Sequence, residues 1–165
     1  MDALWAPWRM EFIQAEQPKG CIFCVFPAEE GLEADRRNLV LGRSGHAFAI
    51  LNKFPYNNGH LMVVPRRHTA DFTALPEDEF HDLHRLLKLA VEVVRDAYAP
   101  HGYNLGMNLG RVAGAGIADH LHYHIVPRWG GDTNFMPVLS ETKVMIEHLT
   151  QGWDRMRGLF DQRLG

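Results

Sequence analysis

Three histidines occupy alternate positions in the segment HLHYH, residues 120–124. In a β-strand, side chains two residues apart point to the same face, so His120, His122 and His124 would share one face, opposite Leu121 and Tyr123. Imidazole groups can ligate a metal ion or attack phosphorus near neutral pH. Three histidines in register, backed by an apolar face, favour a site with chemistry over a solvated strand face.

Two kinds of chemistry fit this spacing. Histidines on alternate strand positions could ligate a catalytic zinc that activates water. Alternatively, the central His122 could act as a nucleophile toward a phosphate while its neighbours orient it and stabilise negative charge. The preceding loop, RVAGAGIAD (111–119), favours the second interpretation, because Gly110, Gly114 and Gly116 would let backbone N–H groups approach an anion closely.

The chain has two cysteines, Cys21 and Cys24, in the sequence CIFC. The N-terminal segment lacks the basic and apolar regions of a secretory signal peptide, so a structural disulfide is not expected. A CxxC pair is typical of a metal half-site or a redox pair. Buried reduced cysteines are the plain alternative.

The surrounding elements form an α+β pattern. Strands are expected at 46–52, 60–65, 103–110 and 120–127, with turn residues Asn57-Asn58-Gly59 between the first two. A helix is expected at 76–99, because apolar residues recur there at three- and four-residue spacing. A second helix is expected from about Ser140 to Leu164. Because strands and helices do not alternate regularly, the sheet should be antiparallel.

Composition limits the function classes. With 165 residues, 46% of them hydrophobic, and a net charge of −3, the chain fits one ordinary domain and does not fit a protein that binds long nucleic acid through a basic face. No apolar run approaches the roughly 18–20 residues that span a bilayer. We therefore expect a cytoplasmic protein with neither nucleic acid nor membrane as partner.

These motifs resemble the histidine triad (HIT) family of nucleotide hydrolases and transferases. HLHYHIV (120–126) fits the family signature, and NGHLMVVPRRH (58–68) is similar to a second hallmark, Gly-His followed by a strand and Pro-x-x-His. The stretches LWAPWRM, NKFPYNNGHLMVVP and HLHYHIVPRWGGDTNF resemble the branch of bacterial diadenosine tetraphosphate phosphorylases.

The resemblance implies a fold. It is one HIT domain over residues 1–165, with an N-terminal extension (1–20), a core (about 21–130) and a C-terminal helical tail (about 140–164). The core would hold a five-stranded antiparallel sheet and two main helices, with the sheet continued across a homodimer.

The resemblance also implies site residues. His122 would form a nucleotidyl-histidine intermediate, supported by His120 and His124, while Asn52 would contact the ribose and Asn108 the phosphates. Further substrate contacts are expected from the loop residues Gly114, Ala115 and Gly116, and from Lys53 and Trp129. Many family members carry a glutamine in this loop, where the present sequence has AGAGIAD. Its loss favours orthophosphate over water as the attacking group.

A structural zinc site of Cys21, Cys24, His68 and His120 is a further implication, with no cofactor required for the chemistry. The reaction expected is cleavage of diadenosine tetraphosphate by phosphate to ADP and ATP. The alternatives are a HIT hydrolase of dinucleoside polyphosphates or nucleoside phosphoramidates, a hydrolase with zinc bound by the triad, and a nucleotide-binding module without catalytic activity.

Overall fold

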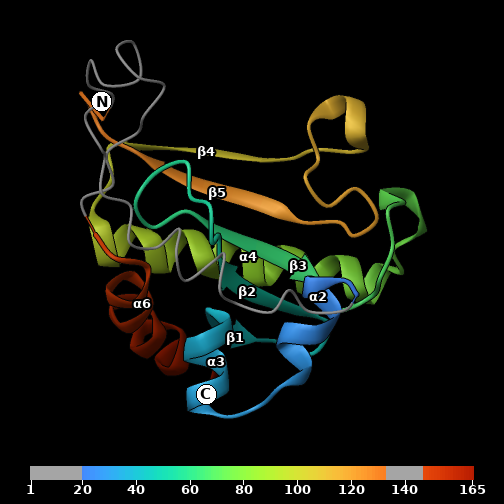
Figure 1. Cartoon of the computed structure of the whole chain (residues 1–165), viewed down its shortest axis with the longest axis horizontal. Coiled ribbons are helices and arrows are strands. Elements are labelled where there is room, and N and C mark those ends of the chain that lie inside the picture. The colour runs from blue at the N-terminus through green and yellow to red at the C-terminus, as the bar shows by residue number, and fades with distance from the viewer. Residues whose placement is uncertain (1–19, 133–146) are drawn as a thin grey trace, which may run out of the picture.

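The fold is built on a five-stranded antiparallel sheet in a computed structural model that describes residues 20–132 and 147–165 (Figure 1). The N-terminal extension to residue 19 and residues 133–146 lie outside the described ranges. The strands are β1 (Val40–Arg43), β2 (Ala47–Leu51), β3 (Leu61–Pro65), β4 (Gly102–Met107) and β5 (Tyr123–Arg128). Their order in the sheet is β1-β2-β3-β5-β4, and every neighbouring pair is antiparallel.

The sheet confirms four strands that the sequence indicates and the fifth that the family resemblance implies. The segment of β1 gives a weak signal because it is short and its pairing with β2 is irregular between Val40 and Gly42. Strand β5 begins at Tyr123 rather than His120, because the backbone just before it turns toward another partner: the N–H of Leu121 donates to the carbonyl of Thr69.

Helix α4 (Glu77–Tyr98) lies along one face of the sheet and confirms the helix expected at 76–99. Its apolar residues Leu83, Leu87, Ala90 and Val94 are buried. Pro76 precedes its first turn, which carries three acidic residues that complement the helix dipole. His124 of β5 therefore lies on the sheet face that α4 leaves open, because the neighbouring Tyr123 points toward α4, where it contacts His84.

Helix α6 (Leu149–Leu164) forms the C-terminal tail and packs against β1 and α4. It begins at Leu149 rather than near Ser140, and residues 140–146 of the expected helix lie outside the described part of the chain. Trp153, Met156 and Phe160 are buried, as their helical spacing predicts. The structure also has two short helices that the sequence pattern does not indicate, α2 (Ile22–Val25) and α3 (Leu32–Asn38).

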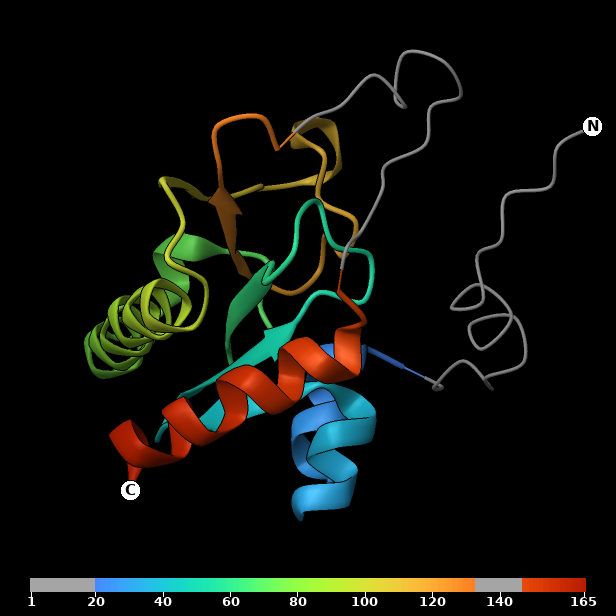
Figure 2. The same cartoon turned by 90° about the vertical axis from the view of Figure 1, so that its left-hand side faces the viewer.

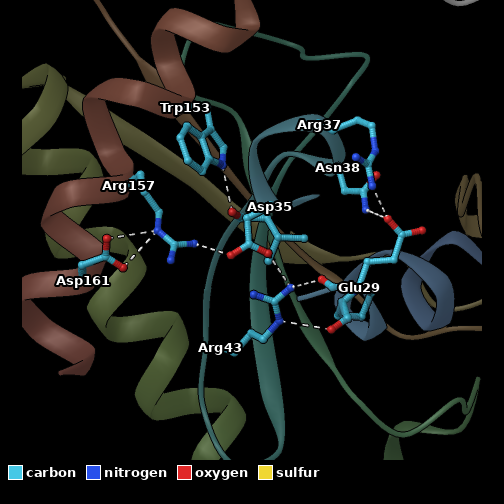
Figure 3. A network of polar contacts seen from close by, with 10 residues as sticks. Glu29, Asp35, Arg37, Asn38, Arg43, Trp153, Arg157 and Asp161 are labelled. Atoms are coloured by element: carbon cyan, nitrogen blue, oxygen red, sulfur yellow. Dashed lines mark hydrogen bonds and ion pairs between the residues drawn. The ribbon is translucent and has the colours of Figure 1, made fainter. Parts of the chain in front are cut away.

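A buried ionic network ties α6 and α3 to β1 (Figure 3). Asp35 of α3 is 2% exposed and pairs with Arg43 of β1 at 2.5 Å and with Arg157 of α6 at 2.8 Å. The indole N–H of Trp153 donates to the carbonyl of Val40 at 2.8 Å. Figure 2 shows α6 beside α3 at this end of the sheet. The network fixes the edge of the sheet that lies far from the histidines.

In the described part of the chain, every helix is too short or too polar to cross a membrane.

Candidate active site

The three triad histidines lie in a row. The row begins at His120, beside Cys21, Cys24 and His68, and ends at His124 on the open face of β5. His120 and His122 precede the strand and are 1% and 4% exposed, whereas His124 lies within it and is half-buried. The rings of His122 and His124 are 4.9 Å apart, and Phe23 of α2 packs 5.1 Å from His122 and 5.5 Å from His120. The three histidines therefore lie on the same side of the chain, as expected, although only His124 belongs to a strand.

Hydrogen bonding leaves His122 with the free nitrogen lone pair that a nucleophile requires. Its Nδ1 lies 2.8 Å from the carbonyl oxygen of His120. A carbonyl can only accept, so Nδ1 carries the proton and Nε2 carries the free lone pair. Burial lowers the pKa of His122, which keeps the imidazole neutral at physiological pH.

A second chain of hydrogen bonds fixes His124. The backbone N–H of Tyr56 donates to Nδ1 of His60 at 2.9 Å, so His60 is protonated at Nε2 and donates to Nδ1 of His124 at 3.0 Å. His124 is thereby protonated at Nε2, where it can donate to a substrate oxygen. Burial, together with the neighbouring His122, lowers the pKa of His124 to about 4. His60 thus contacts the triad directly through a hydrogen bond, and the Gly-His motif of the sequence marks its position.

The four expected metal ligands come together. The ligand atoms of Cys21, Cys24, His68 and His120 all lie within 4.8 Å of one another. Sγ–Nδ1 separations are 3.4 Å for Cys21–His120, 3.4 Å for Cys24–His68 and 3.7 Å for Cys24–His120, and the two Nδ1 atoms are 3.2 Å apart. Tetrahedral zinc separates its S and N ligands by about 3.5 Å and its two N ligands by about 3.3 Å. These spacings fit a closed Cys₂His₂ site.

The environment of His120 supports this role. Its Nε2 lies 2.8 Å from the carbonyl of Pro65, so Nε2 carries the proton and the Nδ1 lone pair faces the cysteines. Burial lowers the pKa of His120, which favours the neutral imidazole that a metal requires. The backbone carbonyl of His120 also accepts the proton of His122, so this residue links the two sites.

A cleft of about 470 Å³ opens beside His124, over β5 and β4. Its volume is typical of small-molecule sites. It is lined by Tyr56, Asn104, Leu105, Gly106, Met107, Asn108, His124, Val126 and Arg128. Of the expected substrate-binding residues, Asn108 lies in this lining. Tyr56, Asn104 and Arg128 were not identified from the sequence, because only the folded sheet brings them together.

The Gly-rich loop is more closed than the sequence suggests. The N–H groups of Ala113, Gly114 and Ala115 donate to carbonyls of the loop itself, and the Asn108 amide donates to the carbonyl of Gly114 at 3.3 Å. Among the residues that the structure describes, the N–H of Gly116 has no backbone acceptor. Of the four N–H groups of residues 113–116, the N–H of Gly116 is therefore the one that this conformation leaves available to an anion.

The remaining expected contacts lie around the edges of the site. Asn52 is half-buried at the end of β2, where its Oδ1 accepts from the N–H of Phe54, and Lys53 is exposed beside it. Trp129 packs against Tyr98 with ring centroids 6.4 Å apart and is not part of the cleft lining. Substrate contacts from these three residues stay predictions.

A five-stranded antiparallel sheet with an ordered histidine row and a lateral cleft defines a histidine triad protein. The HIT domain profile matches residues 33–131, more than half of the chain, and the chain belongs to this family. It is similar to the AP-4-A phosphorylase of Mycobacterium tuberculosis, with 40% identity over 155 residues that cover 90% of this chain and 79% of that protein.

Solved structures of histidine triad proteins have a similar fold. A hypothetical histidine triad nucleotide-binding protein of Sulfolobus tokodaii matches with a TM-score of 0.67 and 29% identity over 86% of this chain and 93% of its own. A Zn-bound histidine triad family protein of Mycobacterium smegmatis matches with a TM-score of 0.65 and 23% identity, over 87% of this chain and 94% of its own, which shows the shared fold.

Proposed function

We propose that this protein is a nucleotidyl transferase that cleaves diadenosine tetraphosphate with orthophosphate, giving ADP and ATP. The observation that carries the proposal is a pair of hydrogen bonds that gives two neighbouring histidines complementary tautomers. His122 has a free Nε2 lone pair and His124 a free Nε2–H, each fixed by a hydrogen bond on its other nitrogen. The 40% identity to a protein described as an AP-4-A phosphorylase supports this choice of substrate.

In the first step, Nε2 of His122 forms a bond to the α-phosphorus and the bond from that phosphorus to the bridging oxygen breaks. ATP is the leaving group, and the Nε2–H of His124 stabilises the charge that develops on its oxygen. In the second step, an oxygen of orthophosphate attacks the same phosphorus. The phosphorus–nitrogen bond breaks, the lone pair of His122 is restored and ADP is released.

Loop 110–116 and Asn108 support orthophosphate as the acceptor. The loop is built from glycine, alanine and valine after Arg111, so no long side chain occupies the place that many relatives give to glutamine. Asn108 borders the cleft, and the N–H of Gly116 offers a donor to an anion. A glutamine that would orient water is missing from this loop, which favours phosphate in the second step.

We further propose that Cys21, Cys24, His68 and His120 hold a structural zinc ion. Two thiolates and two imidazoles leave no open position, so a bound zinc would supply crosslinking rather than chemistry. It would join the N-terminal segment to the residue whose carbonyl fixes the proton of His122.

A homodimer through β4 is also proposed. Among the described strands, β4 pairs only with β5, and Leu105 on it is 52% exposed. A second copy could continue the sheet at this edge. The molar mass in solution tests this: Leu105→Glu should shift a dimer toward monomer, and a monomeric wild-type protein would contradict the proposal.

Product analysis tests the reaction. With diadenosine tetraphosphate and phosphate, we expect ADP and ATP in equal amounts, and cleavage should depend on phosphate. AMP plus ATP at a rate independent of phosphate would identify a hydrolase instead.

A further inference from the structure

The cleft beside His124 lies on the side of the triad where the leaving group begins. Its lining contains His124 but neither His122 nor Asn52. Nδ1 of His124 is bonded to His60, which leaves its Nε2–H for a ligand. A hydrogen-bond donor beside the nucleophile can stabilise the oxygen of the leaving group. If His122 attacks the α-phosphorus as proposed, the cleft starts next to the bond that breaks.

Sheet topology gives the direction of the substrate. Asn52 directly follows β2, His124 lies in β5, and β4 is the next strand beyond β5. A nucleotide with its ribose near Asn52 and its α-phosphate at His122 would continue across β5 onto β4. Its leaving portion would therefore cross the cleft, away from the transferred nucleoside.

The floor of the cleft is open at the point where the phosphate chain of the substrate would cross. Gly106 of β4 is the register partner of His124, and pairing puts the two residues on the same face. A Cβ atom added to Gly106 would meet no atom within 4 Å. The space next to His124 is therefore available to a ligand.

Arg128 offers anion-binding groups farther along the cleft. It lies four residues after His124, about 13 Å along the strand. Its guanidinium donates to both carboxylate oxygens of Asp132, at 2.6 and 3.1 Å, and to Oδ1 of Asn104 at 2.8 Å. A guanidinium has five N–H donors, so these bonds fix its plane and leave donors for a phosphate.

Tyr56 lines the cleft close to His124. Its side chain lines the cleft and the residue is 58% exposed. Its ring is stacked 4.8 Å from His60 and lies 6.0 Å from His124. Asn57 holds this loop on β5, because its amide donates to the carbonyl of Pro127 and to Asp132.

We propose that this cleft is a second subsite, which holds the leaving nucleoside polyphosphate and selects substrates by the length of the phosphate chain. Gly106 provides the floor, Tyr56 the wall next to the first phosphates, and Arg128 the contact to the distal phosphates. This inference rests on the proposed function. Orthophosphate, the acceptor, needs only the end of the cleft at His124, because it attacks from the position that the leaving oxygen vacates.

Two reactions of the same enzyme separate the two ends of the cleft. Phosphorolysis of diadenosine tetraphosphate uses the whole subsite, whereas exchange of radiolabelled phosphate into ADP uses only the end at His124. In Arg128→Met, we expect the ratio of phosphorolysis to exchange, each measured as kcat/KM, to fall at least about tenfold, since a charged hydrogen bond is lost. Tyr56→Leu should also lower this ratio and keeps the backbone N–H that fixes His60. Phe54→Leu, an exposed aromatic residue of the same loop outside the cleft lining, is the matched control.

Substrate length gives a second readout. Wild-type protein should prefer the tetraphosphate to the diadenosine triphosphate and diphosphate, and Arg128→Met should reduce this preference. The exchange reaction shows in each variant whether the protein is folded and competent. An equal loss of both reactions, or an unchanged ratio in Arg128→Met, would overturn the subsite. If the wild-type protein catalyses neither reaction, the proposed function itself fails.

Discussion

Nε2 of His60 lies 3.0 Å from Nδ1 of His124 and joins the loop after β2 to the histidine triad. The N–H of Tyr56 at the other ring nitrogen leaves only one direction for this hydrogen bond. A backbone amide therefore sets the tautomer of His124 through His60. The Gly-His motif has its physical explanation in this relay.

Replacing His60 by phenylalanine keeps an aromatic ring beside Tyr56 but removes the donor to His124. We expect kcat/KM for diadenosine tetraphosphate to fall about 100-fold, the scale of a lost proton donor. The loss should be much smaller for a nitrophenyl ester of AMP, whose leaving group needs little stabilisation. His84→Phe, a half-buried histidine bonded to Tyr123 on the other sheet face, should stay within about twofold. Equal losses for both substrates would indicate a merely structural role for His60.

The depressed pKa of His124 predicts its titration. Burial lowers this pKa from 6.5 to about 4, so His124 should stay neutral through pH 5–8. The unfolded chain binds this proton near pH 6.5 and the folded chain only near pH 4. The free energy of unfolding should therefore decrease as pH falls from about 6.5 to 4. Imidazole ¹⁵N chemical shifts followed against pH measure the titration directly; a His124 that titrates at 6.5 or above would refute the assignment.

The Cys₂His₂ cluster predicts one zinc ion for each chain. Bound zinc should raise Tm by about 2–4 °C for each kcal/mol of stabilisation, and chelation should reverse the shift. The double variant Cys21→Ser, Cys24→Ser should lose zinc and stability yet still form the nucleotidyl intermediate when folded, because the metal is structural. Loss of the intermediate in a folded, zinc-free protein would favour a catalytic metal.

Short sequence motifs are sufficient to predict which residues the fold brings together at the centre of the site. Alternating histidines, CxxC and Pro-x-x-His each depend on local spacing, so their resemblance to one family groups Cys21, Cys24, His68 and His120, and the fold brings these four together. The long helix follows from apolar periodicity for the same reason. These features are encoded within short segments.

Features that depend on packing between distant segments were missed. Nothing in the local sequence around Asp35 indicates that its carboxylate is buried and paired with two arginines from β1 and α6. Tyr56 and Arg128 are separated by 72 residues in the sequence and border one cleft only after β3 and β5 pair. The glycine loop was expected to present several N–H groups, but its own turns use three of them.

The Asp35 network predicts a large stability effect far from the active site. Asp35→Ala would leave Arg43 and Arg157 partly buried without their carboxylate, so the free energy of unfolding should fall by about 3 kcal/mol. Asp154→Ala is the matched control, because it breaks the exposed pair with Arg36 between the same two helices and should cost less than about 1 kcal/mol. Urea denaturation measures both; similar small losses would contradict a structural role for the network.

The central claim is nucleotide transfer through His122, and trapping the intermediate tests it most directly. Protein mixed with diadenosine tetraphosphate without phosphate should gain the mass of one adenylyl group, and peptide mapping should place it on His122. Added phosphate should discharge the adduct as ADP, and His122→Ala should form none. An adduct on another residue, or turnover without any adduct, would contradict this account.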